Sequence, residues 1–452
     1  MLDQIISHKQ EVVTKRRSEI EAYKNTLEPS KKSMIQALKK HKRAFICEIK
    51  LASPSQGLIR KNIDISDVAR IYEPFADAMS VLAEEKFFMG ALSNVKKISE
   101  EQACPVLCKD IVVSPLQVYE ARHYGADAVL LMLSVLDDQT YKKCEEVALK
   151  LKMDIICETH TAEEIKRANN LGAAIIGINN RNLGNLEIDL ETTARLRPLV
   201  HPNAVVIAES GFVNNQQILR YAGLVDGFLV GTSLMRARRI DLALRELIFG
   251  RVKICGLTNA HDARLAYDFG AYYGGLNFWS FSKRRINLEE AKAIIKHAPL
   301  SYGGVFVNQS IDEVINIAQE LRLDFVQLHG EEGKDYIREL RRLLAPDCEI
   351  WKAIRVKDKI LVPEKNNADL ILFDTFSPQA YGGTGTTFDW GLCKEYAAHK
   401  FGVAGGLSTS NIRQAAGLNA FVLDIASGAE ENDCRRKSPE RLSKIFALLR
   451  GE

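Results

Sequence analysis

The chain has 452 residues, with 61 lysines and arginines against 58 aspartates and glutamates, which gives a formal net charge of +3 at pH 7. Because the basic residues are spread along the chain, nucleic acid is not an expected partner. No run approaches the roughly 20 apolar residues of a membrane-spanning helix, so a membrane is not an expected partner either.

Cysteine and histidine usage narrows the protein class further. The nine cysteines form no CxxC pair and several lie in apolar, strand-like runs, a usage typical of reduced thiols in a cytoplasmic protein. The nine histidines show neither HxH nor HExxH spacing, so no metal site is expected. No GxGxxG motif follows a predicted strand, so no nicotinamide or other cofactor is expected.

Taken in chain order, the pattern begins with residues 1–43, whose amphipathic character predicts additional helices that cover the mouth of the domain behind them. Short β-branched runs then alternate with amphipathic stretches, as parallel strands alternate with crossover helices. The strands predicted in the first half are Phe45–Ile49, Ser80–Ala83, Val106–Lys109, Ala128–Met132, Asp154–Glu158, Ile175–Ile178, Val205–Glu209 and Phe228–Val230. Those predicted in the second half are Val252–Cys255, Tyr273–Phe278, Gly304–Val307, Phe325–Leu328, Ile350–Ile354, Leu370–Asp374, Gly402–Ala404 and Phe421–Leu423.

Eight strands in each half predict two tandem (β/α)8 TIM barrels, since one such barrel needs roughly 250 residues or somewhat fewer. Each half also ends on a pair of strands followed by glycine-containing loops, where such barrels commonly hold a substrate phosphate. We therefore expect phosphorylated small-molecule substrates. No linker separates the halves, so the predicted domains are residues 1–250 and 251–452. A covalent pair of barrels has little need of a further partner, and a monomer is expected.

In a barrel of this kind, chemistry is expected from polar side chains at the carboxyl ends of the strands. Glu48 and Lys50 are two residues apart, so they point to the same face of the first strand. A single lysine or glutamate there is more often a solvated strand end or an ion pair. Polar residues at six strand ends that converge on one mouth instead favour an active site. In such a site neighbouring charges drive pKa values apart and so assign acid and base roles. The other candidates in the first half are Lys109, Glu158, Asn179, Arg181, Glu209 and Ser210.

Four segments of the first half, in order, resemble indole-3-glycerol phosphate synthase: Glu48–Ser55, Leu107–Asp110, Ile176–Leu183 and Ala208–Gly211. The resemblance implies that Lys109 is the general acid on the substrate carbonyl and that Glu158 serves as acid and base in dehydration. Lys50 and Glu48 would assist. It further implies that Asn179 and Arg181 orient the anthranilate portion, an arginine role that suits carboxylates. The substrate phosphate would be bound by Ser53, Gly211, Gly231 and Thr232.

The second half places a thiol, Cys255, at the end of its first predicted strand. A single cysteine with apolar neighbours is usually core packing. Here Asp374 ends the sixth predicted strand at the same mouth, and a thiol facing a carboxyl across a phosphate site can act as a base and acid pair. A free thiol has a pKa of about 8.5, so the site would have to favour the thiolate.

These motifs resemble phosphoribosylanthranilate isomerase, together with Ser282–Arg284, Gly304–Asn308, Val326–Gly330 and Gly382–Trp390. By that resemblance Asp374 opens the furanose ring, Cys255 removes the C2 proton, and Arg284 binds the anthranilate end. Gln327 and His329 are further candidates, although His329 could equally be a hydrogen-bonded interior histidine. The phosphate would be bound by Gly383, Gly385, Gly405, Gly406, Ser427 and Gly428.

Two other interpretations remain at this point. The first is a sugar-phosphate isomerase of histidine biosynthesis, which would be expected to pair two aspartates where this chain offers Cys255. The second is a sugar-phosphate sensor without chemistry, which would have no use for Lys50, Lys109 and Glu158 together. We expect a fused enzyme that catalyses two consecutive steps of tryptophan biosynthesis, with the isomerase acting first.

Overall fold

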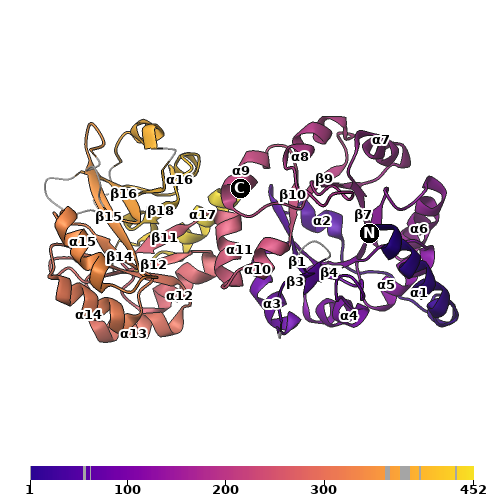
Figure 1. Ribbon diagram of the computed structural model, residues 1–452, viewed down its shortest axis with the longest axis horizontal. Helices are drawn as coiled ribbons and strands as arrows, with labels where there is room; N and C mark the ends of the chain where they lie inside the picture. The colour runs from indigo at the N-terminus through magenta and orange to yellow at the C-terminus, as the bar shows by residue number, and fades with distance from the viewer. Residues whose placement is uncertain are drawn as a thin grey trace. The chain divides into compact units, whose positions relative to one another are not determined.

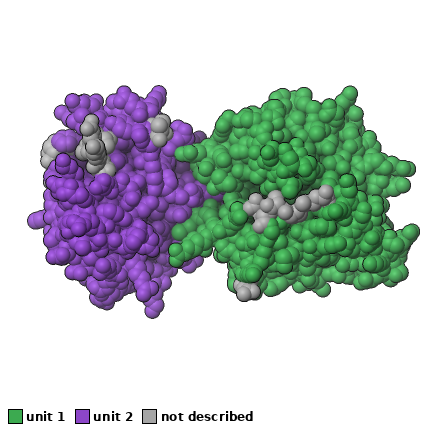
Figure 2. Space-filling view, in the orientation of Figure 1, with its two compact units in different colours: residues 1–244 green, residues 245–452 purple. Residues whose placement is uncertain are grey.

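The computed structural model describes residues 2–53, 57–61, 63–361, 367–376, 387–396, 399–432 and 435–452. The chain divides into two compact units, residues 1–244 and 245–452 (Figure 2). Each unit holds a closed barrel of parallel strands surrounded by helices (Figure 1), which confirms the predicted pair of (β/α)8 barrels. The predicted boundary after residue 250 lies just past the end of helix α11 (Ile240–Phe249), whereas the division between the units falls inside this helix.

The first barrel closes in the order β1-β10-β9-β8-β7-β6-β5-β4. Its strands are β1 (Ala44–Ile49), β4 (Ala78–Leu82), β5 (Val106–Lys109), β6 (Ala128–Met132), β7 (Asp154–Thr159), β8 (Ile175–Asn179), β9 (Val205–Glu209) and β10 (Gly227–Val230). A short antiparallel pair, β2 (Ala52–Ser53) and β3 (Gly57–Leu58), follows β1 and was not predicted. The helices after the first strand are α3 (Ile65–Tyr72), α4 (Leu92–Glu101), α5 (Pro115–His123), α6 (Asp138–Lys150), α7 (Ala162–Leu171), α8 (Glu191–Leu196), η1 (Arg197–Leu199), α9 (Asn215–Tyr221), α10 (Thr232–Arg236) and α11.

Two helices precede the first barrel, as predicted: α1 (Leu2–Tyr23) and α2 (Met34–Leu38). Helix α1 is attached to the barrel by a buried lysine, Lys9, which is 2% exposed. The Lys9 Nζ lies 2.8 Å from the Asp110 carboxylate and 3.2 Å from the Glu85 carboxylate. Both acids follow strands of the barrel, β5 and β4, so these ion pairs hold α1 at the carboxyl ends of the strands.

The second barrel runs in simple sequence order, from β11 to β18 and back to β11. Its strands are β11 (Val252–Cys255), β12 (Tyr273–Asn277), β13 (Ser301–Phe306), β14 (Phe325–Leu328), β15 (Glu349–Val356), β16 (Leu370–Thr375), β17 (Phe401–Val403) and β18 (Val422–Ile425). Its helices are α12 (Ala260–Phe269), α13 (Leu288–His297), α14 (Ile311–Leu321), α15 (Lys334–Leu343), η2 (Trp390–Tyr396), α16 (Ile412–Ala416), η3 (Ser427–Ala429) and α17 (Pro439–Arg450).

Many of the helices begin at the residue types that cap an N-terminus best. The side chain of the capping residue accepts a hydrogen bond from a backbone N–H of the first turn, which would otherwise lack a partner. In the second barrel these residues are Asn259, Asn287, Ser310 and Ser438. Because a cap stops the chain from continuing as a helix on its N-terminal side, each of them marks where a loop from the preceding strand ends.

Strand β13 begins earlier than predicted, at Ser301 rather than Gly304. Glycine is a poor strand former, so the sequence signal for a strand starts only after Gly303. In the barrel, a side chain at Gly303 would overlap the ring of Phe325, and one at Gly304 would overlap the ring of Phe306. Both residues pair with β12 and β14, and both are glycines because neighbouring aromatic rings occupy the space that side chains would need.

Three further expectations can be compared with the described residues. None of the eight cysteines among them forms a disulfide. No helix in the described ranges is both long and apolar enough to cross a membrane. Within the same ranges no cluster of three or more histidine, cysteine, aspartate or glutamate side chains could hold a metal ion.

Candidate active sites

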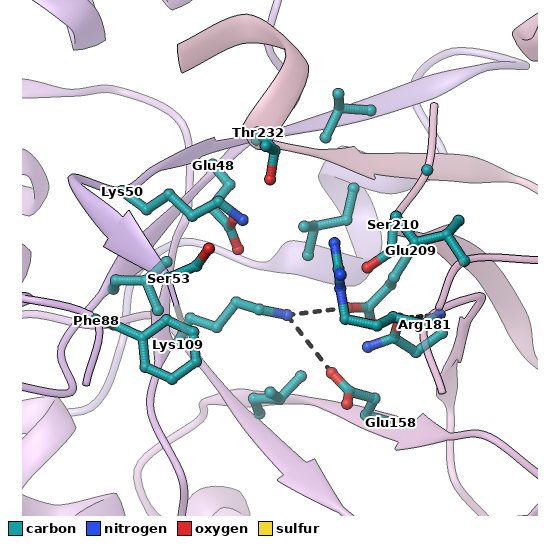
Figure 3. Close-up of a pocket in the computed structure, with 18 of the residues that line it drawn as sticks. Glu48, Lys50, Ser53, Phe88, Lys109, Glu158, Arg181, Glu209, Ser210 and Thr232 are labelled. Atoms are coloured by element: carbon teal, nitrogen blue, oxygen red, sulfur yellow. Dashed lines mark hydrogen bonds and ion pairs between the residues drawn. The ribbon is translucent and has the colours of Figure 1, made fainter. Parts of the chain in front are cut away.

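The first barrel encloses a cavity of about 670 Å³ at the carboxyl ends of its strands (Figure 3). Every candidate residue that the sequence analysis named in this half lines it. These residues come from the ends of six strands and from the loops that follow them: Glu48, Lys50, Ser53, Lys109, Glu158, Asn179, Arg181, Glu209, Ser210, Gly211, Gly231 and Thr232. The arrangement follows from the parallel barrel, which brings all carboxyl strand ends to one mouth.

Lys109 lies at the centre of this site, between two carboxylates. Its Nζ is 2.9 Å from Glu209 Oε2 and 3.5 Å from Glu158 Oε2, as the dashed lines in Figure 3 indicate. Burial alone would lower the pKa of Lys109, but Glu209 and Glu158 outweigh it and raise this pKa above its ordinary value. Lys109 is therefore an ammonium at neutral pH, which is the form that can donate a proton.

The two carboxyls that flank Lys109 differ in their protonation. Burial raises the pKa of Glu209 to about 7, with Glu158 adding to the rise and Lys109 opposing it. Burial opposes ionisation of Glu158 as well, but Lys109 and His160 bring the pKa of Glu158 below its ordinary value. Neighbouring carboxyls whose pKa values are driven apart are the usual arrangement for assigning acid and base roles.

A glycine in strand β8 makes room for Glu209. A Cβ atom at Gly177 would overlap the Glu209 carboxyl, so only glycine allows this carboxyl to reach Lys109. Among the described residues, Glu209 Oε1 has no hydrogen-bond partner although it is buried. A buried acceptor without a partner is costly unless it is protonated or meets a ligand.

A second ion pair joins Glu48 and Lys50 across one face of β1. The Lys50 Nζ is 2.6 Å from Glu48 Oε1. Burial works against ionisation of Glu48, but Lys50 and Lys109 bring the pKa of Glu48 below its ordinary value. The loop residue that follows β10 approaches closely here, because a side chain at Gly231 would overlap the Glu48 carboxyl. Ser210 and Gly211 follow β9 with positive φ angles of 67° and 95°, which turns their backbone toward the cavity mouth.

Asn179 and Arg181 are linked locally after β8. The Asn179 Oδ1 accepts the backbone N–H of Arg181 at 3.0 Å, and the Arg181 Nη1 donates to the carbonyl oxygen of Leu186 at 2.9 Å. Burial lowers the pKa of Arg181. These contacts hold Arg181 at the wall of the cavity, where Figure 3 labels it.

Three features of this site were missed from the sequence. Phe88 lines the cavity because the Glu84 carboxylate accepts three backbone N–H groups and folds the loop that carries it. His160 Nε2 lies 3.3 Å from the catalytic candidate Glu158. Leu2 and Ile5 of α1 complete the wall. The sequence did contain a signal for Phe88, because Glu84 and the aromatic pair Phe87 and Phe88 follow the predicted strand Ser80–Ala83. The contacts of α1, in contrast, depend on packing between distant segments.

In the second barrel, Cys255 and Asp374 lie at the carboxyl ends of β11 and β16. Since these strands are parallel members of one closed barrel, both residues belong to the same mouth, as the sequence analysis required. Asp374 is 3% exposed, and its Oδ1 accepts the backbone N–H of Thr375 at 2.7 Å. A thiol and a carboxyl at one mouth are suited to paired proton transfer.

Gln327 and His329 are joined to Asp374 in a line. Gln327 Nε2 is 3.1 Å from His329 Nδ1, and His329 Nε2 is 3.0 Å from Asp374 Oδ2. If the amide of Gln327 donates to Nδ1, the histidine carries its proton on Nε2 and donates it to Asp374. His329 is therefore a hydrogen-bonded interior histidine, the second of the two interpretations in the sequence analysis, and its contact orients the candidate acid.

Arg284 lies against Gly256, which has a φ of +70° and directly follows Cys255. Two of its nitrogens contact the carboxylate of Glu430, at 2.7 and 2.8 Å. The same carboxylate receives Lys437 at 2.8 Å, and Lys437 also donates to the carbonyl oxygen of Cys255 at 2.7 Å. Glu430 and Lys437, which were not predicted, therefore tie the arginine to the end of β11.

The predicted phosphate loops of this barrel are described in part. Gly405 and Gly406 have φ angles of +81° and +65°, and a Cβ at Gly405 would lie 2.8 Å from Asp374 Oδ1. Gly428 leaves no room for a side chain beside the carbonyl of Leu407, and Ser427 begins the short helix η3. Gly383 and Gly385 lie outside the described residues.

Two barrels with reacting groups and glycine-containing loops at the carboxyl ends of their strands define a bifunctional enzyme of the phosphate-binding TIM-barrel class. Comparison with known proteins gives the family. The family model of indole-3-glycerol phosphate synthase matches residues 2–247, and that of N-(5'-phosphoribosyl)anthranilate isomerase matches residues 252–447. The chain belongs to the family of bifunctional tryptophan biosynthesis enzymes, with the synthase in its N-terminal barrel and the isomerase in its C-terminal barrel.

Relatives of this kind match from end to end. The tryptophan biosynthesis protein TrpCF of Vibrio parahaemolyticus is 43% identical over 100% of this chain and 94% of its own length. The TrpCF protein of Vibrio cholerae is 42% identical over 100% of this chain and 96% of its own length. Among solved structures, a phosphoribosyl anthranilate isomerase from Thermus thermophilus is 34% identical, covers 44% of this chain and 98% of its own, and has a TM-score of 0.40.

Proposed function

We propose that the two barrels act in succession on one anthranilate-bearing sugar phosphate, with the residues named above as the reacting groups. The C-terminal barrel isomerises N-(5-phosphoribosyl)anthranilate to 1-(2-carboxyphenylamino)-1-deoxyribulose 5-phosphate. The N-terminal barrel closes this product to indole-3-glycerol phosphate and releases CO2 and water. The observation that carries the assignment of residues is the position of Lys109 Nζ, within 3.5 Å of two buried carboxylates in the 670 Å³ cavity.

In the isomerase barrel, Asp374 donates a proton to the ring oxygen while the anthranilate nitrogen supplies electrons, so that the bond from C1 to the ring oxygen breaks. This leaves an open-chain Schiff base. The Cys255 thiolate then removes the proton on C2, and the electrons of that C–H bond move toward the nitrogen and neutralise it. The resulting enol becomes the ketone by tautomerisation, with no net change in atoms. The hydrogen bond between His329 and Asp374 supports this role, since it orients the acid.

In the synthase barrel, Lys109 protonates the substrate carbonyl oxygen as the aromatic carbon attacks the carbonyl carbon. Loss of CO2 restores the aromatic ring, and Glu158 then serves in the loss of water. Lys50 and Glu48 assist from the opposite side of the cavity mouth. The charges favour this division, because Lys109 is held as an ammonium whereas Glu158 is held as a carboxylate.

Substrate binding is assigned to the remaining groups around each mouth. In the first barrel Asn179 and Arg181 receive the anthranilate carboxylate, and Glu209 and Ser210 line the same side. In the second barrel Arg284 receives it, and Gln327 positions His329. The phosphates are bound by Ser53, Gly211, Gly231 and Thr232 in the first barrel, and by Gly405, Gly406, Ser427 and Gly428 with Gly383 and Gly385 in the second.

The experiment that tests this assignment supplies phosphoribosylanthranilate to the full chain and follows both products over time. The carboxyphenylamino intermediate should rise first, and indole-3-glycerol phosphate should follow. Indole product without any dependence on isomerase-barrel residues such as Cys255 would contradict the order of steps.

We also propose the setting in which the enzyme works. None of the eight described cysteines forms a disulfide, which fits the reducing cytoplasm. We further propose that the chain is a monomer and that its barrels fold separately, with residues 1–250 and 251–452 as the two domains. Sedimentation of the purified chain and activity of the separated halves would test these points.

A further inference from the structure

A buried ion pair lies directly beneath the reacting thiol of the second barrel. The Nζ of Lys253, in β11, is 2.8 Å from Asp424 Oδ2, in the neighbouring strand β18. The side chain of Lys253 is 0% exposed and that of Asp424 is 6% exposed. Neither residue has a role in the function proposed above.

The geometry places this ammonium beside Cys255. Lys253 and Cys255 are two residues apart in one strand, so their side chains leave the same face of β11. Both border Gly275 of β12, because a Cβ there would lie 2.9 Å from Cys255 Sγ and 3.0 Å from Lys253 Cε. The thiol and the lysine chain thus share the space that this glycine leaves open.

Stability alone does not account for such a pair. Removing two charges from water costs several kcal/mol per ion, and well-packed apolar residues of similar volume are often as stable as a buried pair. On the same face of the barrel, neighbouring positions are filled with apolar side chains that pack together, such as Tyr273, Trp351 and Val422. A charged pair at the adjacent positions therefore calls for a role in the chemistry.

The other charges near Cys255 have carboxylate partners of their own. Lys437 donates to the Cys255 carbonyl oxygen, not to the thiol, and pairs with Glu430. Arg284 also pairs with Glu430. Burial raises the pKa of the Cys255 thiol, and the largest opposing influence is the positive charge of Lys253. Burial works against the charge of Lys253 in turn, but Asp424 keeps the pKa of Lys253 above its ordinary value.

We propose that Lys253, held in place by Asp424, is a positioning residue that stabilises Cys255 as a thiolate and so prepares it to remove the substrate proton. This inference rests on the proposed function of Cys255 as the base. Asp424 acts through Lys253, because it orients the ammonium and keeps it protonated.

The test compares the full chain with Lys253→Met and Lys253→Arg. Two quantities are measured from pH 5 to 10: kcat/KM of the isomerase, and the rate at which iodoacetamide alkylates Cys255, read by mass spectrometry of its peptide. A nearby opposite charge changes a pKa by about one unit or more. Lys253→Met should therefore shift the rising limb of both profiles to higher pH by about one unit. At a fixed pH on that limb, both rates should then fall about tenfold. Lys253→Arg keeps the charge and should leave the limb near its original place.

Controls separate this role from a structural one. The double variant Lys253→Met/Asp424→Asn removes the carboxylate that the single variant leaves unpaired, and should show the same displaced limb. Lys352→Met breaks a partly buried pair of the same barrel, with Glu332 at 2.7 Å, four strands away on β15, and should leave the alkylation limb of Cys255 unmoved. Denaturant titration followed by the fluorescence of Trp279, Trp351 and Trp390, which all lie in the second barrel, reports whether each variant of that barrel is folded.

A uniform loss of isomerase activity at every pH, with both limbs in place, would overturn the inference. Failure of the proposed function looks different: Cys255→Ala would then retain isomerisation. In that case the alkylation profile still reports whether Lys253 stabilises the thiolate.

Discussion

In the first barrel the central lysine forms ion pairs with two carboxylates, whereas in the second barrel the reacting thiol and the reacting carboxyl each have separate partners. Lys109 contacts Glu209 and Glu158 within 3.5 Å. Asp374 is instead oriented by the hydrogen-bonded line through His329, and Cys255 lies above the pair formed by Lys253 and Asp424. The same strand arrangement therefore supports two kinds of proton chemistry, because the side chains at the strand ends, and not the barrel, decide which charges meet.

The largest expected effect is the loss of one activity while the other persists. Cys255→Ala should lower isomerase kcat by about 10²–10⁴-fold, the range for removing a general base, and leave indole formation from the carboxyphenylamino intermediate unchanged. Separate steady-state assays with each substrate measure this. Loss of both activities in a folded variant would show that the two sites are not independent.

Lys109→Ala should have the converse effect, with synthase activity reduced by about 10²–10³-fold, in the range for removing a general acid. It also leaves Glu158 and Glu209 without their shared ammonium. The isomerase of the same chain serves as the control. Near-normal formation of indole-3-glycerol phosphate would contradict the general-acid assignment.

A glycine substitution should disturb the first site through packing. Gly177→Ala forces the Glu209 carboxyl to move, so we expect a destabilisation of about 1–3 kcal/mol and reduced synthase activity. Gly223→Ala, in the same barrel, has nothing within 4 Å of the added atom and should change neither quantity. Equal behaviour of the two variants in denaturant titrations would count against the close approach at Gly177.

A smaller effect is expected on the pH dependence of stability. The pKa of Glu209 rises from its ordinary value of 4.5 to about 7. A carboxyl whose pKa is raised in the folded state adds stability that is fully present below pH 4.5 and is lost as the pH rises through 7. The stability of the wild type relative to Glu209→Gln should therefore fall between these pH values. Hydrogen exchange in peptides of β8 and β9 would show it, and a constant difference would refute it.

The smallest effect on activity is expected from cutting the chain. Separate fragments should keep both activities, because each barrel has its own core. A second-barrel fragment that starts at residue 240 should be more stable than one that starts at residue 251 by about 1.5–3 kcal/mol, the value of burying a phenylalanine. Phe249 packs on Phe446 with ring centroids 5.2 Å apart. Fluorescence reports this directly, since Trp279, Trp351 and Trp390 all lie in the second barrel.

The sequence alone determined the alternation of strands and helices, the two barrels and the polar residues at the strand ends. This was possible because strand propensity and hydrophobic pattern are local, and because parallel strands bring every carboxyl end to one mouth. For the same reason the twelve candidates of the first half all proved to line one cavity.

Only the tertiary structure decided which charged side chains pair with each other. Lys9 and Asp110 are separated by 101 residues, and Lys253 and Asp424 by 171, so no local pattern connects them. Gly303, which the prediction left out of β13, belongs to this strand because it pairs with β12 and β14, and the ring of Phe325 fills the space that a side chain would need there. Which charges face each other in a buried site depends on packing between distant segments, and in low-dielectric surroundings that pairing sets which groups hold protons.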